Sequence, residues 1–350
     1  ADVVATGSNA AKVEAGQAEA GERLRFAVLD VRDSAAVSAF GNIAAYYRNQ
    51  QSLQQTPPPL THLAAPDVEG ARLLIEGVLA QRRHVLTEME SKALLSAFHI
   101  PVTQTILART PSEAVMLASQ LGYPVALKID SPDITHKSDV DGVALNVMNG
   151  VSVRDIFERM MENVSRKIPG ARINGISVQR MARQTRGREL YIGMVTDEPF
   201  GPVIAFGAGG NTVELYSHRS MELPPLNQFL ARQMIQQSAV AHTLDAWRGA
   251  NPVNHEALEQ VLLRVSEMVC ELPQLREMDI NPIIVDEHGA VAVDARIVVT
   301  EVGQTSGTGH HGSYGHLAIM PYPERLEQTW PLRGGGEYLV RPIHPSDAQM

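Results

Sequence analysis

Two apolar runs, Val125–Ile129 and Val143–Val147, flank a polar loop whose residue types suit the handling of phosphate. Lys128 stands at the end of the first run, where an ammonium group can meet a phosphate as a point charge. His136 lies within the loop, and a neutral imidazole can accept a phosphoryl group and later release it. A solvated lysine at a strand end and an ordinary surface histidine are the alternatives that these two residues leave open.

A second set of candidate residues consists of Asp279, Asn281 and Asp294. The segments REMDINPIIV and AVAVDAR have the pattern of two antiparallel strands turned at His288-Gly289, which would bring Asn281 and Asp294 side by side. One carboxylate and one amide oxygen, with phosphate oxygens completing the shell, suit Mg²⁺. The alternative is a pair of polar turn residues at strand ends.

A glycine-rich turn, Phe206–Asn211 (FGAGGN), follows the apolar run Val203–Phe206. Glycines after a strand let backbone N–H groups approach a phosphate closely. The segment lacks the GxxxxGK[ST] pattern of a P-loop, so a turn that needs glycine for purely structural reasons is the alternative.

Alternating helices and strands must position these residues. Thr87 and Glu90 have the spacing of a capping box and predict a helix that ends before Pro101. Ile173–Met181 and Glu189–Val195 have the pattern of neighbouring strands joined by a polar run. This alternation, with several adjacent hairpins, favours α/β and α+β lobes over a single parallel sheet.

The composition bounds the class of protein. A chain of 350 residues is long enough for two or three domains, and a net charge of -9 argues against a nucleic-acid partner. The single cysteine, Cys270, excludes an internal disulfide and favours the cytoplasm. No apolar run reaches membrane-spanning length, so we expect no membrane partner. The sequence leaves the oligomeric state open, a homo-oligomer included.

Six ordered blocks of sequence resemble the ATP-grasp region of ADP-forming (NDP-forming) acyl-CoA synthetases. The blocks are SPDITHKSDVDGV, VQRMA with GRELYIG, FGPVIAFGAGG, LPPL, EMDINPIIV and VDARIVV. The resemblance covers residues 84–299 and implies an ATP-grasp fold of two α/β lobes.

The flanking segments carry weaker resemblances. Residues 1–55 look like the end of a succinyl-CoA-synthetase-like, flavodoxin-type domain, and residues 338–350 look like the start of a truncated GNAT acetyltransferase domain. Composition predicts linkers at 56–83 and 300–337. This domain order resembles that of Pat-type bacterial protein lysine acetyltransferases, which belong to the GNAT family.

The resemblance implies roles for individual residues by matching position. Lys128 would bind nucleotide phosphates, and His136 matches the histidine that relays phosphate in active synthetases. Asn281 and Asp294 would be the Mg²⁺ ligands, so ATP or ADP with Mg²⁺ is the expected cofactor set. The other residues of the nucleotide pocket would be Glu189, Gly207, Gly209 and Gly210.

Three residues depart from the synthetase pattern. Asp141 stands where synthetases have a second glycine, Arg180 where an acid is common, and Glu222 where an arginine is frequent. An acid that faces a triphosphate opposes binding unless a cation intervenes. The departures favour a chain that has lost synthetase activity.

Three readings of the function follow, in order of preference. The first is the synthetase-like regulatory part of a protein lysine acetyltransferase, whose GNAT domain would transfer acetyl from acetyl-CoA to protein substrates such as acyl-CoA synthetases. The second is an active ADP-forming acyl-CoA (acetate-CoA) synthetase that uses His136 as phosphate carrier. The third is an interaction scaffold whose pocket is filled by side chains.

Overall fold

The computed structural model of the chain describes residues 3–7, 24–28, 38, 64–134, 137–181, 187–210, 219–246, 251–301, 314–323, 326–343 and 347, with backbone alone at 3–7 and 24–28. The chain divides into two units, residues 1–56 with 342–350 and residues 57–341. In the first unit, β1 (Val3–Gly7) pairs in parallel with β2 (Leu24–Val28). The assignment of residues 1–55 to a flavodoxin-type domain stays a prediction.

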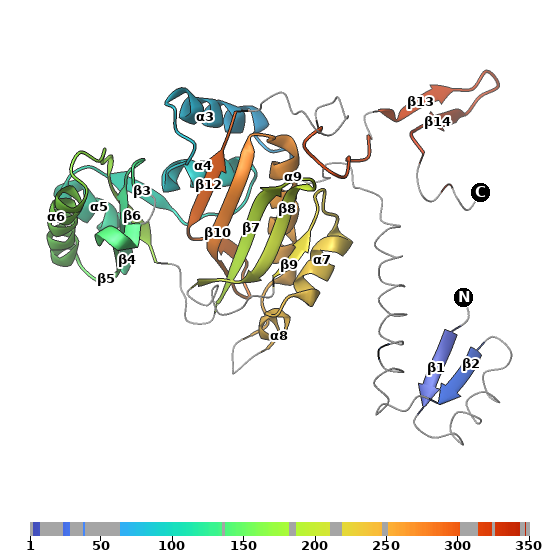
Figure 1. Ribbon diagram of the computed structural model, residues 1–350, viewed down its shortest axis with the longest axis horizontal. Coiled ribbons are helices and arrows are strands. Elements are labelled where there is room, and N and C mark those ends of the chain that lie inside the picture. The colour runs from blue at the N-terminus through green and yellow to red at the C-terminus, as the bar shows by residue number, and fades with distance from the viewer. Residues whose placement is uncertain are drawn as a thin grey trace. The chain divides into compact units, whose positions relative to one another are not determined.

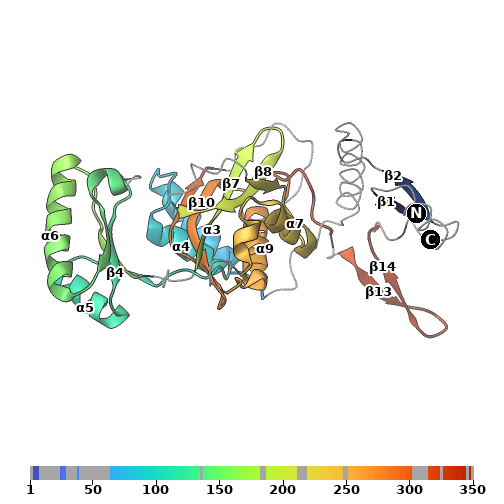
Figure 2. The same ribbon diagram turned by 90° about the horizontal axis from the view of Figure 1, so that it is seen from below.

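Within residues 57–341, the segment from Thr105 to Arg180 forms a small lobe with an antiparallel sheet and two helices (Figures 1 and 2). The strands in order across the sheet are β3 (Thr105–Ala108), β6 (Gly175–Arg180), β4 (Val125–Asp130) and β5 (Val143–Val147). The helices are α5 (Pro111–Leu121) and α6 (Gly150–Lys167), and the short 3-10 helix η2 (Lys137–Val140) precedes β5. The first and last strands of the lobe are paired, with Thr105 opposite Gln179.

Strand β4 shows how the sequence assigns its two faces. Val125, Leu127 and Ile129 lie in the apolar core that α5 and α6 share. Because successive side chains of a strand point to opposite faces, Lys128 and Asp130 point away from the helices. This alternation puts a lysine and an acid on the face of the small sheet that its helices do not cover.

The large lobe contains an antiparallel sheet covered by helices (Figure 1). Its strand order is β11-β10-β7-β8-β9, and β12 pairs with β10. The strands are β7 (Arg188–Asp197), β8 (Gly201–Ala208), β9 (Ser220–Glu222), β10 (Leu275–Val285), β11 (Ala290–Ala292) and β12 (Ala295–Val299). The helices are α3 (Val68–Ala80), α4 (Glu88–Ala97), α7 (Gln228–Gln237), α8 (Ala241–Leu244) and α9 (His255–Glu271).

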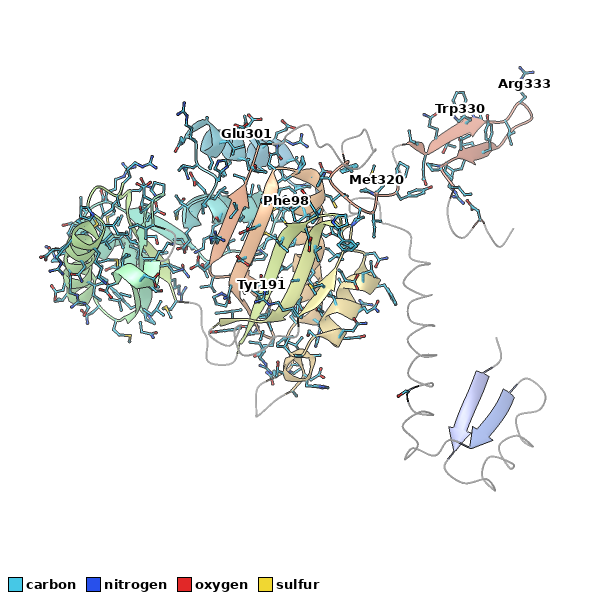
Figure 3. The ribbon with its side chains drawn as sticks, viewed as in Figure 1. Phe98, Tyr191, Glu301, Met320, Trp330 and Arg333 are labelled. Carbon is cyan, nitrogen blue, oxygen red and sulfur yellow. The ribbon has the colours of Figure 1, made fainter. Side chains whose placement is uncertain are left out.

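The large lobe also has one apolar and one polar sheet face. Leu190, Ile192 and Met278 are buried in a core that includes Phe98, which lies at the end of α4 (Figure 3). Tyr191 and the neighbouring acids of β10 occupy the alternate positions, so they face away from this core. The polar faces of the two lobes are therefore the surfaces available for a site.

Local sequence rules predicted several of these elements correctly. The N–H of Glu90 donates to Thr87 Oγ1 over 3.3 Å, and the N–H of Thr87 donates to Glu90 Oε2 over 2.8 Å, which is the predicted capping box. The predicted strand pair after residue 275 is confirmed, because β10 pairs with both β11 and β12.

One predicted pairing is wrong. We expected Ile173–Met181 and Glu189–Val195 to be neighbouring strands, but β6 belongs to the small sheet and β7 to the large one. Strand propensity identifies a strand but does not say which partner it finds.

The segments expected to be linkers contain regular structure. Within 56–83, α3 buries Ala71, Ile75 and Val78 in the core of the large lobe. Those positions have helical spacing, which the three prolines before them obscured. Within 300–337, Leu317 is buried, and β13 (Gln328–Pro331) pairs with β14 (Glu337–Val340), with Trp330 half exposed (Figure 3).

No helix in the described ranges combines the length and the apolar character needed to span a bilayer.

Candidate functional site

Lys128 is buried between the two lobes, so it is not a solvated strand-end lysine. Its side chain is 7% exposed, and its ammonium group donates to Glu88 Oε1 and to Asp294 Oδ2, each over 2.9 Å. Glu88 begins α4 of the large lobe, and Asp294 lies between β11 and β12. One lysine of the small lobe therefore binds two carboxylates of the large lobe.

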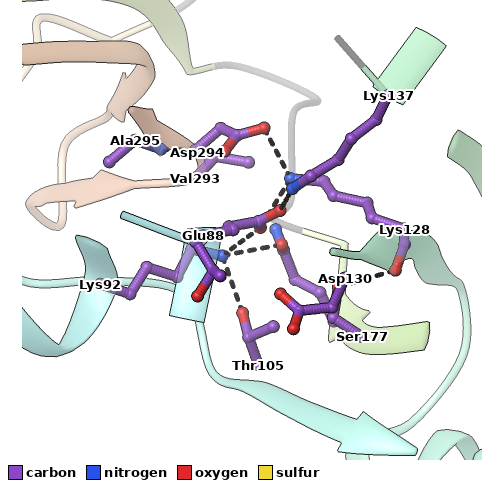
Figure 4. Close-up of polar contacts among 12 residues, drawn as sticks. Glu88, Lys92, Thr105, Lys128, Asp130, Lys137, Ser177, Val293, Asp294 and Ala295 are labelled. Atoms are coloured by element: carbon purple, nitrogen blue, oxygen red, sulfur yellow. Dashed lines mark hydrogen bonds and ion pairs between the residues drawn. The ribbon is translucent and has the colours of Figure 1, made fainter. Parts of the chain in front are cut away.

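Glu88 is the centre of a cluster of charges (Figure 4). Its carboxylate is 2% exposed and accepts from the ammonium groups of Lys92, at 2.9 Å, and of Lys137 as well as Lys128. Lys92 follows one turn later in α4, and Lys137 opens η2 in the small lobe. Three lysines from three elements thus converge on a single buried carboxylate.

The charges in this cluster support one another electrostatically. Burial alone would raise the pKa of Glu88, but Lys128, Lys137 and Lys92 together hold that pKa well below its usual range. Burial would likewise lower the pKa of Lys128, but Asp294 and Glu88 outweigh it and raise that pKa. For Lys92, burial dominates and lowers the pKa. Glu88 and Lys128 are therefore charged at neutral pH.

A cleft of about 440 Å³ opens beside this cluster. That volume lies within the range of roughly 300–1,000 Å³ that holds small-molecule ligands. Its polar lining includes Thr87, Glu88, Ser131, Lys137, Ser138, Asp139, Asp279, Asn281, Asp294 and Arg296. Lys128 is not in the lining, but it contacts two residues that are.

The predicted proximity of Asn281 and Asp294 is confirmed. The N–H of Asn281 donates to the carbonyl oxygen of Asp294 over 3.1 Å, and both side chains line the cleft. Asn281 Oδ1 also accepts from the N–H of Gly210 over 2.7 Å. Asp279 lies on the same strand and accepts from the Tyr191 hydroxyl over 2.7 Å.

These oxygens fit a magnesium ion that also binds phosphate. They are hard donors, and Mg²⁺ is held by one or two carboxylates plus water and substrate phosphates more often than by an all-protein cage. Within the described ranges, no group of three or more His, Cys, Asp or Glu residues could hold a metal. The donor set thus suits a metal that arrives with a phosphate ligand, and the roles of Asn281 and Asp294 stay predictions.

The glycine turn has structural reasons for its composition. A Cβ at Gly209 would lie 2.3 Å from the carbonyl oxygen of Leu190, and Gly210 has a φ of +63°. The N–H of Gly209 donates to the carbonyl oxygen of Glu189 over 2.9 Å. The residues expected in the nucleotide pocket but absent from the described lining of the cleft are Glu189, Gly207, Gly209 and Gly210.

The three departures from the synthetase pattern lie outside this lining. Asp141 has a φ of +56°, a left-handed conformation that favours glycine, and its carboxylate pairs with Lys167 at 2.6 Å. Arg180 is exposed. Glu222 is partly buried in β9, where burial raises its pKa. None of the three sets an acid against the cleft.

Sequence reasoning missed Glu88 and Lys92, and it gave Lys137 no role. Glu88 and Lys92 are four residues apart on a helix, a spacing that usually marks an exposed ion pair. The spacing of the two residues was visible in the sequence, but the burial of their side chains was not. His136, the predicted phosphate carrier, lies outside the described residues.

Comparison with known proteins agrees with the two-lobed arrangement. The family model described as "ATP-grasp domain" matches residues 77–299. The beta subunit of ADP-forming acetate–CoA ligase I from Pyrococcus furiosus is 40% identical over 232 residues, covering 66% of this chain and 99% of that subunit. ADP-forming acetate–CoA ligase I from Archaeoglobus fulgidus is 39% identical over 233 residues, which are 67% of this chain and 33% of that protein.

A solved structure extends the comparison to three dimensions. It is dinucleotide-forming acetyl-coenzyme A synthetase 1 from Ca. Korarchaeum cryptofilum, in complex with coenzyme A, Ca-AMPCP and HgCl⁺. The TM-score is 0.63 at 40% identity, over 66% of this chain and all of that chain. The predicted ATP-grasp fold is therefore confirmed.

The same findings overturn our preferred function. The prediction of a regulatory part of a protein lysine acetyltransferase is wrong, because the relatives are ADP-forming acetyl-CoA synthetases. That prediction depended on residues 338–350, of which the described start belongs to the β13–β14 hairpin. So short a segment could not specify a domain.

With the fold, the cleft and these relatives in agreement, the chain belongs to the ATP-grasp domain family, in the beta-subunit type of ADP-forming acyl-CoA synthetases.

Proposed function

We propose that this chain is the nucleotide-binding component of an ADP-forming acyl-CoA synthetase. The reaction would convert an acyl-CoA, ADP and phosphate into a carboxylic acid, CoA and ATP, and would run in both directions. The observation that carries the proposal is the cluster in which Lys128 and Lys137 meet Glu88 and Asp294 beside a cleft of about 440 Å³. Lysines beside hard oxygen donors are the groups that a nucleotide phosphate with Mg²⁺ requires.

The proposed roles follow from where each side chain lies. Lys128 and Lys137 bind and orient the phosphates of the nucleotide through their ammonium groups. The oxygens of Asn281 and Asp294 hold Mg²⁺, which when bound neutralises charge on the phosphate oxygens. Asp279, fixed by Tyr191, faces the same cleft.

We propose His136 as the phosphate carrier of the reaction. A neutral ring nitrogen attacks the terminal phosphorus of ATP, so a P–N bond forms while the P–O bond to the leaving ADP breaks. The reverse step returns the phosphoryl group to ADP. The relatives agree with this assignment, because one solved synthetase from Ca. Korarchaeum cryptofilum has a phosphohistidine segment pointing towards its nucleotide binding site.

The acyl and CoA half of the reaction lies, in this proposal, outside residues 77–299. The P. furiosus relative is a beta subunit, whereas the A. fulgidus relative is a chain of which the match covers 33%. The remaining chemistry is therefore supplied by a second polypeptide or by a further part of the same one. In either case the nucleotide component should bind ATP without it.

The test is a calorimetric titration with ATP and Mg²⁺. We expect micromolar to millimolar binding by the wild type and a loss of at least tenfold in Asp294→Ala and Asn281→Ala, about 1.4 kcal/mol or more. Glu287→Gln, which changes an exposed acid beyond the end of β10, is the matched control and should bind like wild type. Absence of binding by the wild type would contradict the proposal.

The phosphate-carrier role is tested separately. Incubation with ATP labelled at its terminal phosphate should give a protein label that is stable to base and labile to acid. The label should be absent from His136→Asn. A label that persists in His136→Asn would place the carrier elsewhere.

A further inference from the structure

Glu88 has no counterpart among the residues to which the family resemblance assigned a role, yet it contacts more charged groups than any of them in the described cluster. Its Oε1 accepts from Lys92 and from Lys128, each at 2.9 Å, and its Oε2 accepts from Lys137. Lys92 shares the helix of Glu88, while Lys128 and Lys137 belong to the small lobe. A single carboxylate thus fixes two lysines of the opposite lobe.

The three lysines differ in how many N–H donors of their ammonium groups remain available for a ligand. An ammonium group has three donors. Lys92 already meets four acceptors, namely Glu88, Thr103, Thr105 and Gln179, so it has none to spare. Within the described residues, Lys128 meets two acceptors and Lys137 meets one.

Lys128 and Lys137 can therefore bind a phosphate while Glu88 holds them. Lys128 retains one donor and Lys137 two, so a phosphate oxygen need not displace the carboxylate. Without Glu88, Lys128 would keep Asp294 while Lys137 would lose its acceptor among the described residues, so the nucleotide would have to order the Lys137 side chain at a cost in affinity. Pre-positioning by a buried acid avoids that loss.

We propose that Glu88 is the positioning residue of the phosphate-binding lysines, holding the ammonium groups of Lys128 and Lys137 in place beside the cleft. Glu88 does not itself contact the nucleotide in this scheme. The proposal depends on the proposed function, because it assigns the two lysines to nucleotide phosphate.

The charges around Glu88 define how pH should act. The facing groups are Lys92 on α4, Lys128 and Asp130 on β4, Lys137 and Asp139 on η2, and Asp294 before β12. Burial raises the pKa of Asp130. Removing the negative charge of Glu88 should therefore lower the pKa of the lysines that it contacts.

The experiment compares wild type, Glu88→Gln and Glu88→Asp by titration with ATP and Mg²⁺ at a series of pH values from 6 to 10. In Glu88→Gln we expect affinity to fall at least tenfold, and the decline of affinity at high pH to begin at least one pH unit lower than in wild type. Glu88→Asp keeps the negative charge, but its shorter side chain moves the carboxylate oxygens away from the lysines. It should keep the wild-type pH profile with a smaller loss of affinity.

Glu90→Gln is the matched control, because Glu90 lies on the same helix and also pairs with a cation, Arg83, at 2.6 Å. It should leave the affinity within twofold of wild type and the pH profile unchanged. If Glu88→Gln does not fold, Glu88→Asp decides the matter, and wild-type affinity in that variant overturns the proposal.

Affinity equal to or tighter than wild type in Glu88→Gln, with an unchanged pH profile, would also overturn it, since Glu88 would then compete with phosphate. Failure of the proposed function gives a different result, namely no nucleotide binding by the wild type itself.

Discussion

Two sets of ion pairs, one around α4 and β4 and one around the segment that follows β4, differ in burial. Glu88, Lys92 and Lys128 form a cluster in which each side chain is 7% exposed or less. Asp133 with Arg172, at 2.7 Å, and Asp141 with Lys167, at 2.6 Å, are pairs whose members are 33% to 63% exposed. Similar distances thus occur in two very different dielectric surroundings.

This difference in burial indicates which pairs the stability of the fold depends on. An exposed pair gains little, because water and salt screen both partners. A buried pair gains little over apolar residues of equal volume, but removing one partner leaves a charge with no compensation. We therefore expect the cluster around Glu88 to be sensitive to single substitutions and the exposed pairs to be tolerant.

The largest expected effect is on stability when Lys92 is lost. Lys92→Met removes the ammonium group that joins Glu88 to Thr103, Thr105 and Gln179. Glu88 keeps Lys128 and Lys137, but Thr103, Thr105 and Gln179 lose a buried donor, so the free energy of unfolding should fall by about 1–3 kcal/mol. Urea denaturation followed by circular dichroism measures it.

The control for Lys92→Met is Arg72→Met, which breaks an exposed pair with Glu69, a longer pair with Glu271 at 3.7 Å and a hydrogen bond to the Glu271 carbonyl oxygen. It should change the free energy of unfolding by about 0–1 kcal/mol. Equal changes in the free energy of unfolding would contradict the expected difference between buried and exposed pairs.

A smaller effect should follow from substitution of Asp141. Its φ of +56° is unfavourable for a residue with a Cβ, while its carboxylate pairs with Lys167. Asp141→Gly relieves the backbone and loses the exposed pair, so it should be neutral to within about 1 kcal/mol. Asp141→Ala loses the pair and keeps the strain, so it should be the less stable of the two. The reverse order in thermal melts would show that glycine relieves no strain at this φ.

The smallest effect concerns pH and Asp133. Hydrogen bonds from Arg172 lower the pKa of Asp133 from 3.8 to about 2. Because the pKa is lower in the folded state, the pair stabilises the fold above about pH 4, and this stabilisation is lost as the pH falls towards 2. The urea midpoint of wild type should exceed that of Asp133→Asn slightly at pH 6, with the difference shrinking below pH 4. A difference that does not depend on pH would contradict this assignment.

Sequence reasoning succeeded where the determinants are local. The capping box of Thr87 and Glu90 and the pairing that joins Asn281 to Asp294 depend on residues close together along the chain, and both were predicted. The partner of Glu88 was not, because Lys128 is 40 residues away and meets it only once the two lobes have packed. Burial that comes from tertiary packing leaves no periodic pattern in the sequence.

The same limit explains the errors in topology and function. Nothing in the pattern of β6 and β7 says that their strands enter different sheets. Tyr338 and its neighbours have the alternation of a strand, but that alternation fits a short hairpin as well as the start of a domain. In both cases the local pattern identified a strand correctly and left its partner open.

The pairing of Thr105 with Gln179 has a consequence for how this chain can be taken apart. The small lobe is a continuous insertion with its own core, and it enters and leaves the large lobe by two adjacent strands. Such an insert can be exchanged for that of another protein as a single cassette, since its ends already meet. Lys92 donates to Thr105 and to Gln179, so one side chain of the large lobe is hydrogen-bonded to both the first and the last strand of the insert, where the two lobes join. A graft that preserves those two acceptors, together with Lys128 and Lys137 that bind Glu88, should keep the joint intact.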